Sequence, residues 1–261
     1  MIDLKEALNV AIKAAKKARE EILRVYALDF EVIIKEDNSP VTMADQHADT
    51  IIREVIHSHY PTHAFLTEEE DDDLRRLNSE YVWIVDPVDG TKDFVTKDDE
   101  FTTNIALCIN HEIVVGVVLI PVSGEIYYAI KDQGAYYIDK YGNVERIHVN
   151  DKTLNLIMLT SKHHVTKEEL EYFEAHRDII ASKEQYGSAI KACRIAHGLA
   201  ELQLRFGPGT KEWDTAASQI VVIEAGGVFV TPKGEVMKYN REDVYNREGF
   251  LVANRKENLP L

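Results

Sequence analysis

The amino-acid sequence predicts a layered fold of helices and β-sheets, in the α/β or α+β class. Two observations support this prediction. The first half of the 261-residue chain opens with helical patterns and continues with strand-like segments separated by short turns, whereas the second half alternates strand-like and helical segments. No linker marks the change near Asn150. We therefore expect an N-terminal part over residues 1–150 and a C-terminal part over 151–261, joined as one compact unit.

Helical and turn patterns account for the first sixty residues. Apolar residues recur in steps of three and four over residues 4–22, which predicts a long amphipathic helix. A short strand is expected over 31–35, and a turn over 37–40, where Asp, Asn, Ser and Pro follow one another. Thr42 is a suitable N-cap for a second helix that ends near residue 59.

Strand-like segments dominate the middle of the chain. The apolar residues 82–85 predict a buried strand that stops at Asp86. Three more strand-like segments follow with short separations, which is typical of an antiparallel meander, and they span residues 103–109, 113–119 and 125–130. In the C-terminal part we expect strands at 156–160 and 201–205, and helices near 167–176, 188–197 and 213–224.

The composition is that of an ordinary globular protein and excludes several classes of function. Hydrophobic residues make up 45% of the chain and charged residues 29%, which excludes a disordered or fibrous protein. The net charge of −15 argues against binding to nucleic acid or to an anionic membrane, because both need a basic face. The longest apolar run, residues 113–122, is shorter than the roughly 20 residues that a transmembrane helix needs.

The N-terminus and the two cysteines indicate a reduced, cytoplasmic protein. The first residues form a helical pattern without the apolar core of a signal peptide. Cys108 and Cys193 are far apart, lie among apolar residues and form no CxxC motif, so we expect structural thiols. No Cys-x5-Arg pattern surrounds Cys108, which argues against a thiol nucleophile. His57 and His59 lack the further ligands that a zinc site would need.

Residues 83–94, WIVDPVDGTKDF, are the strongest candidate for a catalytic segment. The predicted strand brings Asp86 to its carboxyl end, and Asp89 follows after a turn fixed by proline. Two carboxylates on one turn can converge on a point, and carboxylate oxygens are ligands that Mg²⁺ prefers. Gly90 permits a tight backbone, and the N–H groups of Gly90 and Thr91 suit a phosphate. The alternative is that Asp-Pro and Asp-Gly only form turns.

Three other carboxylates are candidates, and each has a simpler structural explanation. Glu68 closes an apolar stretch and is expected at the end of a strand, whereas the acidic residues 70–73 fit a solvated loop. Asp214 precedes small residues in the segment WDTAA, and it would otherwise be a helix N-cap. Asp45 lies in the first turn of a predicted helix, where it would stabilise the helix dipole.

In their order and spacing these segments resemble the inositol monophosphatase superfamily of lithium-sensitive, Mg²⁺-dependent phosphatases. The resembling segments extend from about residue 35 to residue 227, and they are DNSPVTMAD, FLTEEE, WIVDPVDGTKDF, EFTTNIAL, GVVLIPVSGEIYYA and RFGPGTKEWDTAA. Within the superfamily the chain is similar to the 3′(2′),5′-bisphosphate nucleotidases of the CysQ type, which the segments DGTK and RFGP favour. The resemblance implies a layered α-β-α-β-α sandwich, the fold of these sugar phosphatases.

The resemblance also implies a role for each candidate carboxylate. Two or three Mg²⁺ ions would be bound by four side chains and one carbonyl, those of Glu68, Asp86, Asp89, Asp214 and Val88. Thr91 would position the attacking water and help to deprotonate it. Asp45 would accept the proton of the Thr91 hydroxyl and so orient this pair. Glu68 is assigned to catalysis as well as to metal binding.

Further residues would contact the substrate. By resemblance the substrate-binding set comprises Glu68, Val88, Asp89, Gly90, Thr91, Ser161, His163, Gly187, Ser188, Lys191, Arg205 and Asp214. Lys191 and Arg205 would bind the second phosphate of a nucleotide, which the negative charge of the whole protein would otherwise repel. The alternative is that these two residues are surface cations.

A few positions leave details of the pocket open. His163 and His164 compete for one role beside Ser161. Ala189 stands where relatives commonly have a second serine, which would remove one polar contact. Ser218 stands where relatives usually have glycine, and we expect a small local effect.

We expect a phosphomonoester hydrolase that uses an activated water. Its substrate would be 3′-phosphoadenosine 5′-phosphate or the sulfonated form of this nucleotide, giving AMP or adenosine 5′-phosphosulfate. The alternatives are an inositol or sugar monophosphatase of the same fold, and a non-catalytic regulator that binds metal or nucleotide. The expected partners are a small-molecule nucleotide bisphosphate and no nucleic acid, with no transmembrane segment and a monomeric or homodimeric chain. Lithium inhibition is an expectation from the resemblance.

Overall fold

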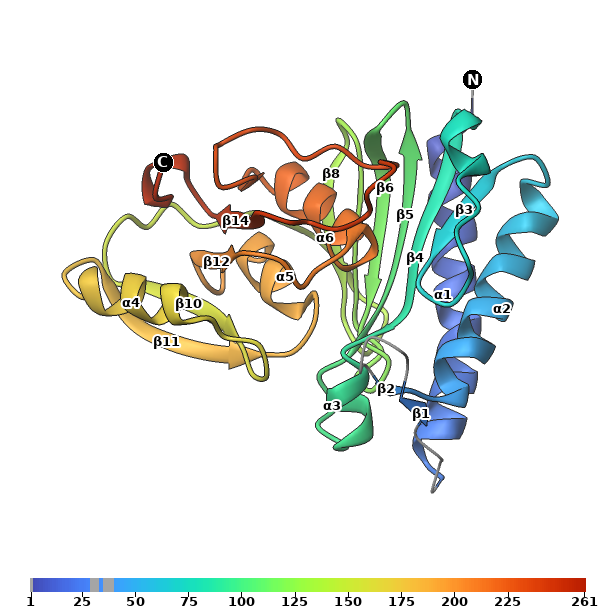
Figure 1. Ribbon diagram of the computed structural model, residues 1–261, viewed down its shortest axis with the longest axis horizontal. Coiled ribbons are helices and arrows are strands. Elements are labelled where there is room, and N and C mark those ends of the chain that lie inside the picture. The colour runs from blue at the N-terminus through green and yellow to red at the C-terminus, as the bar shows by residue number, and fades with distance from the viewer. Residues whose placement is uncertain (1, 29–32, 35–39) are drawn as a thin grey trace.

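The protein is built from five layers in the order helix, sheet, helix, sheet, helix (Figure 1). The computed structural model describes residues 2–28, 33–34 and 40–261. Buried apolar side chains form three clusters, one between the outer helices and the first sheet, one around the middle helices, and one against the far face of the second sheet. This arrangement confirms the expected layered α-β-α-β-α fold.

Helices α1 (Leu4–Tyr26) and α2 (Met43–His59) form the outer layer on one face of the first sheet, at the right of Figure 1. The Asp3 side chain caps α1 by accepting hydrogen bonds from the N–H groups that begin it, and Thr42 caps α2 as expected. The buried face of α1 is rich in alanine, which allows α2 to approach closely. Among the described residues, no helix has the length and apolar composition of a membrane span.

The first sheet has seven strands that lie side by side in chain order. All neighbouring strands are antiparallel except the first two, which are parallel, so the expected meander is confirmed. The last two strands were not predicted, because they are short and rich in polar and aromatic residues. The strands are β3 (Ala64–Thr67), β4 (Tyr81–Asp89), β5 (Thr102–Ile109), β6 (Glu112–Leu119), β7 (Ile126–Ile130), β8 (Gly134–Ile138) and β9 (Val144–Ile147).

The second sheet has the strand order β11-β10-β12-β14-β13, and α4 (Lys167–Ala175) covers its outer face. β10 is parallel to both of its neighbours, whereas β14 is antiparallel to its neighbours. Only β10 and β12 were predicted. β11 was missed because its exposed edge position leaves it without an apolar pattern. The strands are β10 (Leu156–Ser161), β11 (Ile180–Tyr186), β12 (Leu202–Phe206), β13 (Val228–Val230) and β14 (Gly249–Ala253).

Helices α5 (Ile190–Ala196) and α6 (Glu212–Glu224) form the middle layer between the two sheets. Gly116 of β6 lies directly beneath α6. A Cβ atom added at Gly116 would lie 2.5 Å from both the Ala217 carbonyl oxygen and the Ile220 Cγ2. A glycine in the interior of this strand therefore sets the distance at which α6 packs on the sheet.

Two sequence predictions need correction or qualification. The strand predicted to stop at Asp86 continues as β4 to Asp89, although its pairing with β5 shifts register over this stretch, because the turn is accommodated within the strand. The short helix α3 (Thr91–Val95) follows directly. Of the predicted strand over 31–35, only β1 (Ile33–Ile34) is described, paired with β2 (Pro40–Val41). The predicted turn lies mostly outside the described residues.

Gly116→Ala is expected to lower the free energy of unfolding by about 2 kcal/mol, because the added methyl group forces α6 away from the sheet. The measurement is equilibrium unfolding in urea. A variant as stable as the parent protein would show that α6 has room to move at this point.

Candidate active site

A cavity of about 520 Å³ lies where the carboxyl end of β4 meets the start of α6 and the turn before α5. Residues from both halves of the chain line it. Every predicted site residue except Asp45 is on its wall, namely Glu68, Asp86, Val88, Asp89, Gly90, Thr91, Ser161, His163, Gly187, Ser188, Lys191, Arg205 and Asp214. The segments that the sequence singled out over some 150 residues are thus brought together.

Three carboxylates meet on the cavity wall. Asp86, Asp89 and Asp214 each present an oxygen, and these oxygens lie within 4.8 Å of one another. Asp86 lies on the last part of β4 and Asp89 ends that strand. Asp214 is the third residue of α6 rather than its N-cap, the position considered from the sequence.

Each of these carboxylates is held by the protein through one oxygen. Asp86 Oδ1 accepts the Val88 N–H at 3.1 Å, and Asp214 Oδ2 accepts the Lys211 N–H at 2.5 Å. Asp89 Oδ2 accepts three donors, which are the Ala189 N–H at 2.9 Å, Asn104 Nδ2 at 3.1 Å and Thr102 Oγ1 at 3.3 Å. One oxygen of each group is therefore fixed by hydrogen bonds from the protein.

The second oxygen of Asp86, Oδ2, is buried and has no hydrogen-bond partner within the described part of the chain. A buried carboxylate oxygen without a partner is energetically costly, so such an atom indicates a ligand. Oxygen donors alone suit a hard divalent cation. The residues present therefore fit a divalent metal site.

Burial raises the pKa of all three carboxyl groups, and repulsion from neighbouring carboxylates adds to this at Asp86 and Asp214. For Asp86 the pKa is raised well above its usual range by burial and then by the nearby charges of Glu68 and Asp89. Burial raises the pKa of Asp89, although Lys191 and the three donors oppose it. Burial and the Asp89 charge raise the pKa of Asp214 to about 8. A bound cation would reduce the repulsion between these carboxylates and so favour their deprotonated forms.

Asp45 lies behind the cavity wall and contacts Thr91. Its Oδ2 accepts the N–H and the hydroxyl of Thr42 at 2.8 and 2.7 Å, as part of the cap of α2. Its Oδ1 lies 3.2 Å from Thr91 Oγ1, which is also 3.2 Å from the Val88 carbonyl oxygen. Burial raises the pKa of Asp45 to about 6, against the lowering effect of the Thr42 hydrogen bonds. This is the predicted Asp45–Thr91 pair.

The backbone at Gly90 turns the chain from β4 into α3. Gly90 is the N-cap of α3 and has φ 94°, a left-handed conformation that favours glycine. A Cβ here would also lie 3.4 Å from the backbone of Phe101. Gly90 and Thr91 therefore bring their backbone to the cavity beside the carboxylates.

The two predicted phosphate-binding cations differ in their surroundings. Lys191 is 8% exposed, and its Nζ donates to the Ser188 carbonyl at 2.6 Å and to the Tyr186 carbonyl at 3.1 Å. Burial lowers the pKa of Lys191, although the Asp89 charge raises it. Arg205 Nη1 donates to the His164 carbonyl, whereas Arg205 Nε is buried and has no hydrogen-bond partner among the described residues.

Both histidines of the segment beside Ser161 reach the cavity wall. The Ser161 Oγ accepts the N–H groups of His163 and His164 at 3.3 and 3.1 Å, which fixes the turn. His163 Nε2 lies 3.2 Å from Asp93 Oδ1. Burial, and then the nearby Lys92 charge, lowers the pKa of His164 to about 4, so this ring is neutral at pH 7.

Some residues that shape the site were not singled out from the sequence. Thr102 and Asn104 hold Asp89, and the signal was present as a buried polar triplet, TTN, that opens an otherwise apolar strand. Other parts of the wall carry no such signal, because they come from elements far apart in the chain. Further lining residues with a charge, an aromatic ring or an amide were given no role from the sequence, and they are Lys92, Asp93, Gln203, Lys211, Trp213, Phe229, Tyr245 and Phe250.

The fold and the site together define a layered α+β protein with an acidic, metal-type centre between its halves. The family model described as "Inositol monophosphatase family" matches residues 3–261, and the chain belongs to this family. The match covers nearly the whole described chain, so all of the site residues above lie within it.

Curated relatives and solved structures agree with this assignment. The chain is 35% identical over 250 residues to the 3′(2′),5′-bisphosphate nucleotidase CysQ of Salmonella typhimurium strain LT2, covering 94% of this chain and 99% of that protein. It is 33% identical to the Nus factor SuhB of Pasteurella multocida, covering 94% and 90%. The crystal structure of CysQ from Bacteroides thetaiotaomicron superimposes with a TM-score of 0.83 at 34% identity, covering 96% and 98%.

Stabilisation of the protein by Mg²⁺ is expected to be larger at pH 8 than at pH 5.5. The raised pKa values mean that the metal-free folded state binds more protons than the unfolded state. The contribution of these groups to stability is therefore fully present below about pH 4 and is lost as the pH rises through about 6 and 8. A cation binds the deprotonated carboxylates and reverses this loss, raising the melting temperature by about 5 °C at pH 8 and by less than half of that at pH 5.5.

The measurement is thermal unfolding with a chelator or with excess Mg²⁺, at both pH values. Sodium chloride at matched ionic strength controls for general screening. An equal or larger effect of Mg²⁺ at pH 5.5 would contradict the assignment of the raised pKa values to the cation site.

Proposed function

We propose that the protein is a 3′(2′),5′-bisphosphate nucleotidase, a phosphomonoester hydrolase that removes the 3′-phosphate of 3′-phosphoadenosine 5′-phosphate. The sulfonated form of this nucleotide would be hydrolysed in the same way, giving adenosine 5′-phosphosulfate. One observation carries the proposal. The cavity gathers three carboxylates, of which Asp86 is buried and keeps one oxygen without a partner among the described residues, and its wall includes Arg205, whose buried Nε has no partner among them either. The CysQ relative from Salmonella typhimurium carries this activity in its name.

The proposed metal ligands are the side chains of Glu68, Asp86, Asp89 and Asp214 and the carbonyl of Val88, and the proposed ions are two or three Mg²⁺. When bound there, divalent cations supply charge neutralisation for the phosphate and a water that is activated at neutral pH. The donors that hold Asp89 leave its second oxygen fixed in direction. These ligands are therefore preorganised, and they need not rearrange when the substrate binds.

Thr91 and Asp45 are proposed to move the proton of the attacking water. The Thr91 hydroxyl has one proton and two acceptors within reach, the Val88 carbonyl and Asp45 Oδ1. When Val88 serves as a metal ligand, the proton is directed to Asp45. The oxygen of Thr91 can then accept a proton from water, with Asp45 and its pKa of about 6 as the base. Glu68 is proposed to take part in catalysis beside this pair, as well as to bind metal.

The rest of the cavity is proposed to bind the nucleotide. Backbone N–H groups of Gly90 and Thr91 would hold the scissile phosphate. Arg205, whose Nε has no hydrogen-bond partner among the described residues, would bind the second phosphate, and Lys191 would fix the turn at Gly187 and Ser188 while adding positive charge. Ser161 and His163 would complete this wall.

The remaining expectations are compatible with the structure. The proposed site takes its residues from one chain, so it needs no second copy, and a monomer or a homodimer would serve. Cys108 and Cys193 are both free and buried, which suits a reducing compartment, and we propose the cytoplasm. An inositol or sugar monophosphatase would use the same centre, and the SuhB relative keeps this candidate open.

Phosphate release from 3′-phosphoadenosine 5′-phosphate is expected to be at least 10-fold faster, by kcat/KM, than from inositol 1-phosphate at equal Mg²⁺. The control is Asp89→Asn. The amide oxygen can still accept the three donors, while the amide nitrogen replaces the free oxygen, so the fold stays and a ligand is lost. We expect kcat/KM to fall about 1,000-fold, since a lost charge contact of this kind costs about 4 kcal/mol.

Activity that survives Asp89→Asn would contradict the metal assignment. A preference for inositol 1-phosphate would leave the metal centre standing and overturn the nucleotide proposal. No release from either substrate, together with retained binding of Mg²⁺ or nucleotide, would favour a non-catalytic regulator.

Arg205→Met is expected to lower kcat/KM for 3′-phosphoadenosine 5′-phosphate about 50-fold, because a charged hydrogen bond to the second phosphate is lost. For 3′-AMP, which lacks that phosphate, the change should be less than about 3-fold. Arg194→Met is the matched control, since Arg194 also has an Nε without a partner in the described part of the chain but does not line the cavity. Equal losses on both nucleotides would show that Arg205 only supports the fold.

A further inference from the structure

Two of the proposed metal ligands come from opposite halves of the chain. Glu68 directly follows β3, and Asp214 lies in the first turn of α6. β3 is the edge strand of the first sheet, so its carboxyl end is fixed by a neighbour on one side only. The distance between these two ligands therefore depends on whatever connects the segments around them.

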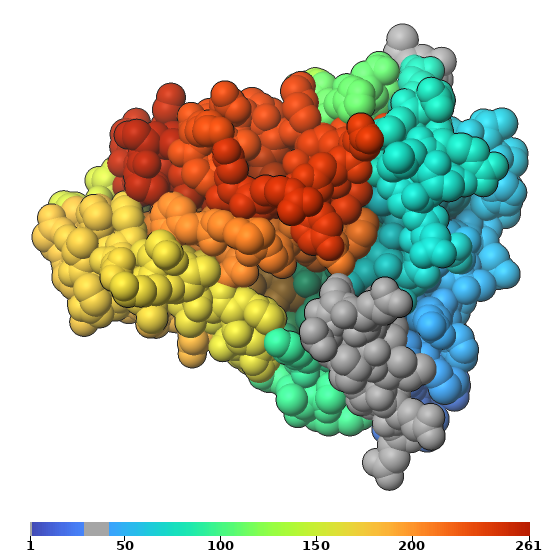
Figure 2. Space-filling view, viewed as in Figure 1, coloured from blue at the N-terminus to red at the C-terminus, as the bar shows by residue number. Residues whose placement is uncertain are grey.

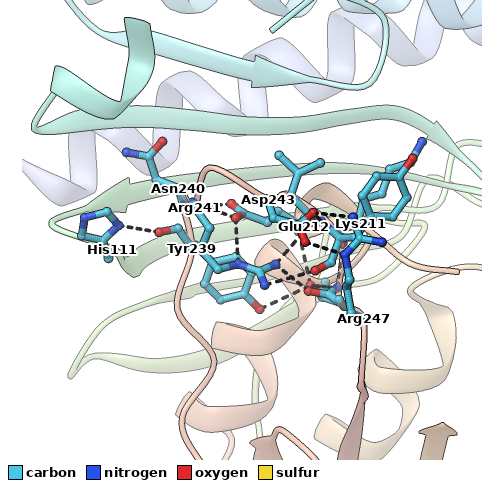
Figure 3. Close-up of polar contacts among 12 residues, drawn as sticks. His111, Lys211, Glu212, Tyr239, Asn240, Arg241, Asp243 and Arg247 are labelled. Carbon is cyan, nitrogen blue, oxygen red and sulfur yellow. Dashed lines mark hydrogen bonds and ion pairs between the residues drawn. The ribbon is translucent and has the colours of Figure 1, made fainter. Parts of the chain in front are cut away.

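A buried polar network centred on Glu212 holds the start of α6 (Figure 3). Glu212 is completely buried and lies two residues before Asp214. Its carboxylate accepts the Asn240 N–H at 2.6 Å, the Arg241 N–H at 2.8 Å and the Arg241 Nε at 3.0 Å. In Figure 3 these groups converge on Glu212 from the C-terminal segment, so this segment and the first turn of α6 form one unit.

Arg76 extends the network to the first half of the chain. It lies in the short helix η1 (Arg75–Asn78) and is 3% exposed. Its Nη1 donates to Asn240 Oδ1 at 2.6 Å, and its Nη2 donates to the Arg241 carbonyl at 2.8 Å and to Asp72 Oδ2 at 2.6 Å. Figure 2 shows the corresponding surfaces in contact, with the red-orange C-terminal segment against the teal segment that follows β3.

The network thus runs without interruption from the loop after Glu68 to the helix that carries Asp214. Asp72 is four residues after Glu68, and Glu212 is two residues before Asp214. Burying charged side chains costs desolvation, and a buried ion pair adds little stability over apolar side chains of similar size. What such a network supplies is a fixed geometry, because each group has directional partners.

We infer that Glu212 and Arg76 are positioning residues that act through Asn240 and Arg241 to set the separation of Glu68 and Asp214, and so the geometry of the cation site. The inference rests on the proposed function in one respect, namely that these carboxylates bind a divalent cation. Neither residue contacts the cation site directly. Groups that orient metal ligands in this way typically change metal affinity 10- to 100-fold when they are removed.

The test is isothermal titration calorimetry of the metal-free protein with Mg²⁺ and with Mn²⁺. Glu212→Gln and Arg76→Met should each weaken binding about 10-fold. The double variant should bind no more than about 3-fold more weakly than either single variant, because both changes break one network and their effects do not add. At saturating Mg²⁺ the KM for nucleotide should stay within about 2-fold, while the Mg²⁺ concentration for half-maximal activity rises.

Glu201→Gln is the matched control. Glu201 is also completely buried and accepts the Ile157 N–H and Asn150 Nδ2, both at 2.6 Å, but none of its partners lines the cavity. This variant should bind cations as the parent protein does. Circular dichroism verifies folding, and the Arg76 variant carries the test if the Glu212 variant does not fold.

Cation affinities equal to that of the parent protein in both variants would overturn the inference. Fully additive losses, or an equal loss in Glu201→Gln, would also overturn it and indicate a general loss of stability. A parent protein that binds no divalent cation would instead overturn the proposed function, so the two failures are distinguishable.

Discussion

The structure depends on gathering three carboxylates at one place, where Asp86 is buried and one of its oxygens has no partner within the described part of the chain. Asp86, Asp89 and Asp214 repel one another, and burial adds to the cost of their charges. The protein holds one oxygen of each group with backbone or side-chain donors, and one oxygen from each group lies within 4.8 Å of the others. Charged carboxylates at this spacing destabilise the protein when no cation is bound, and a divalent cation would offset their repulsion. The arrangement therefore indicates a site for a divalent cation.

The five layers supply the donors that make this arrangement possible. β5 contributes Asn104 to Asp89, and the turn before α5 contributes the Ala189 N–H from the other half of the chain. α6 brings Asp214 to the same point, and its position is set by its close contact with Gly116. The middle layer is therefore both the packing element between the sheets and the element that closes the site. Catalysis and folding are coupled through this one helix.

Much of this could be predicted from the sequence, because the chemistry lies in short segments with strong local patterns. The layered fold followed from the helical periodicity of α1 and the meander of the first sheet, and the family was visible in residues 83–94. Strands β9 and β11 were missed, since edge strands need no continuous apolar pattern. Glu212 and Arg76 were also missed, because their contacts to Asn240 join residues 28 and 164 positions apart in the chain, which no local pattern records.

The central claim is that the free oxygens of these three carboxylates bind divalent cations, and a crystal structure with Mn²⁺ tests it most directly. The anomalous scattering of manganese identifies each ion without reference to the protein atoms. The account predicts peaks at about 2.2 Å from carboxylate oxygens of Asp86, Asp89 and Asp214, with the oxygens that accept the Val88, Ala189 and Lys211 N–H groups still held by them. Peaks elsewhere, or carboxylates that turn away from these donors, would contradict it.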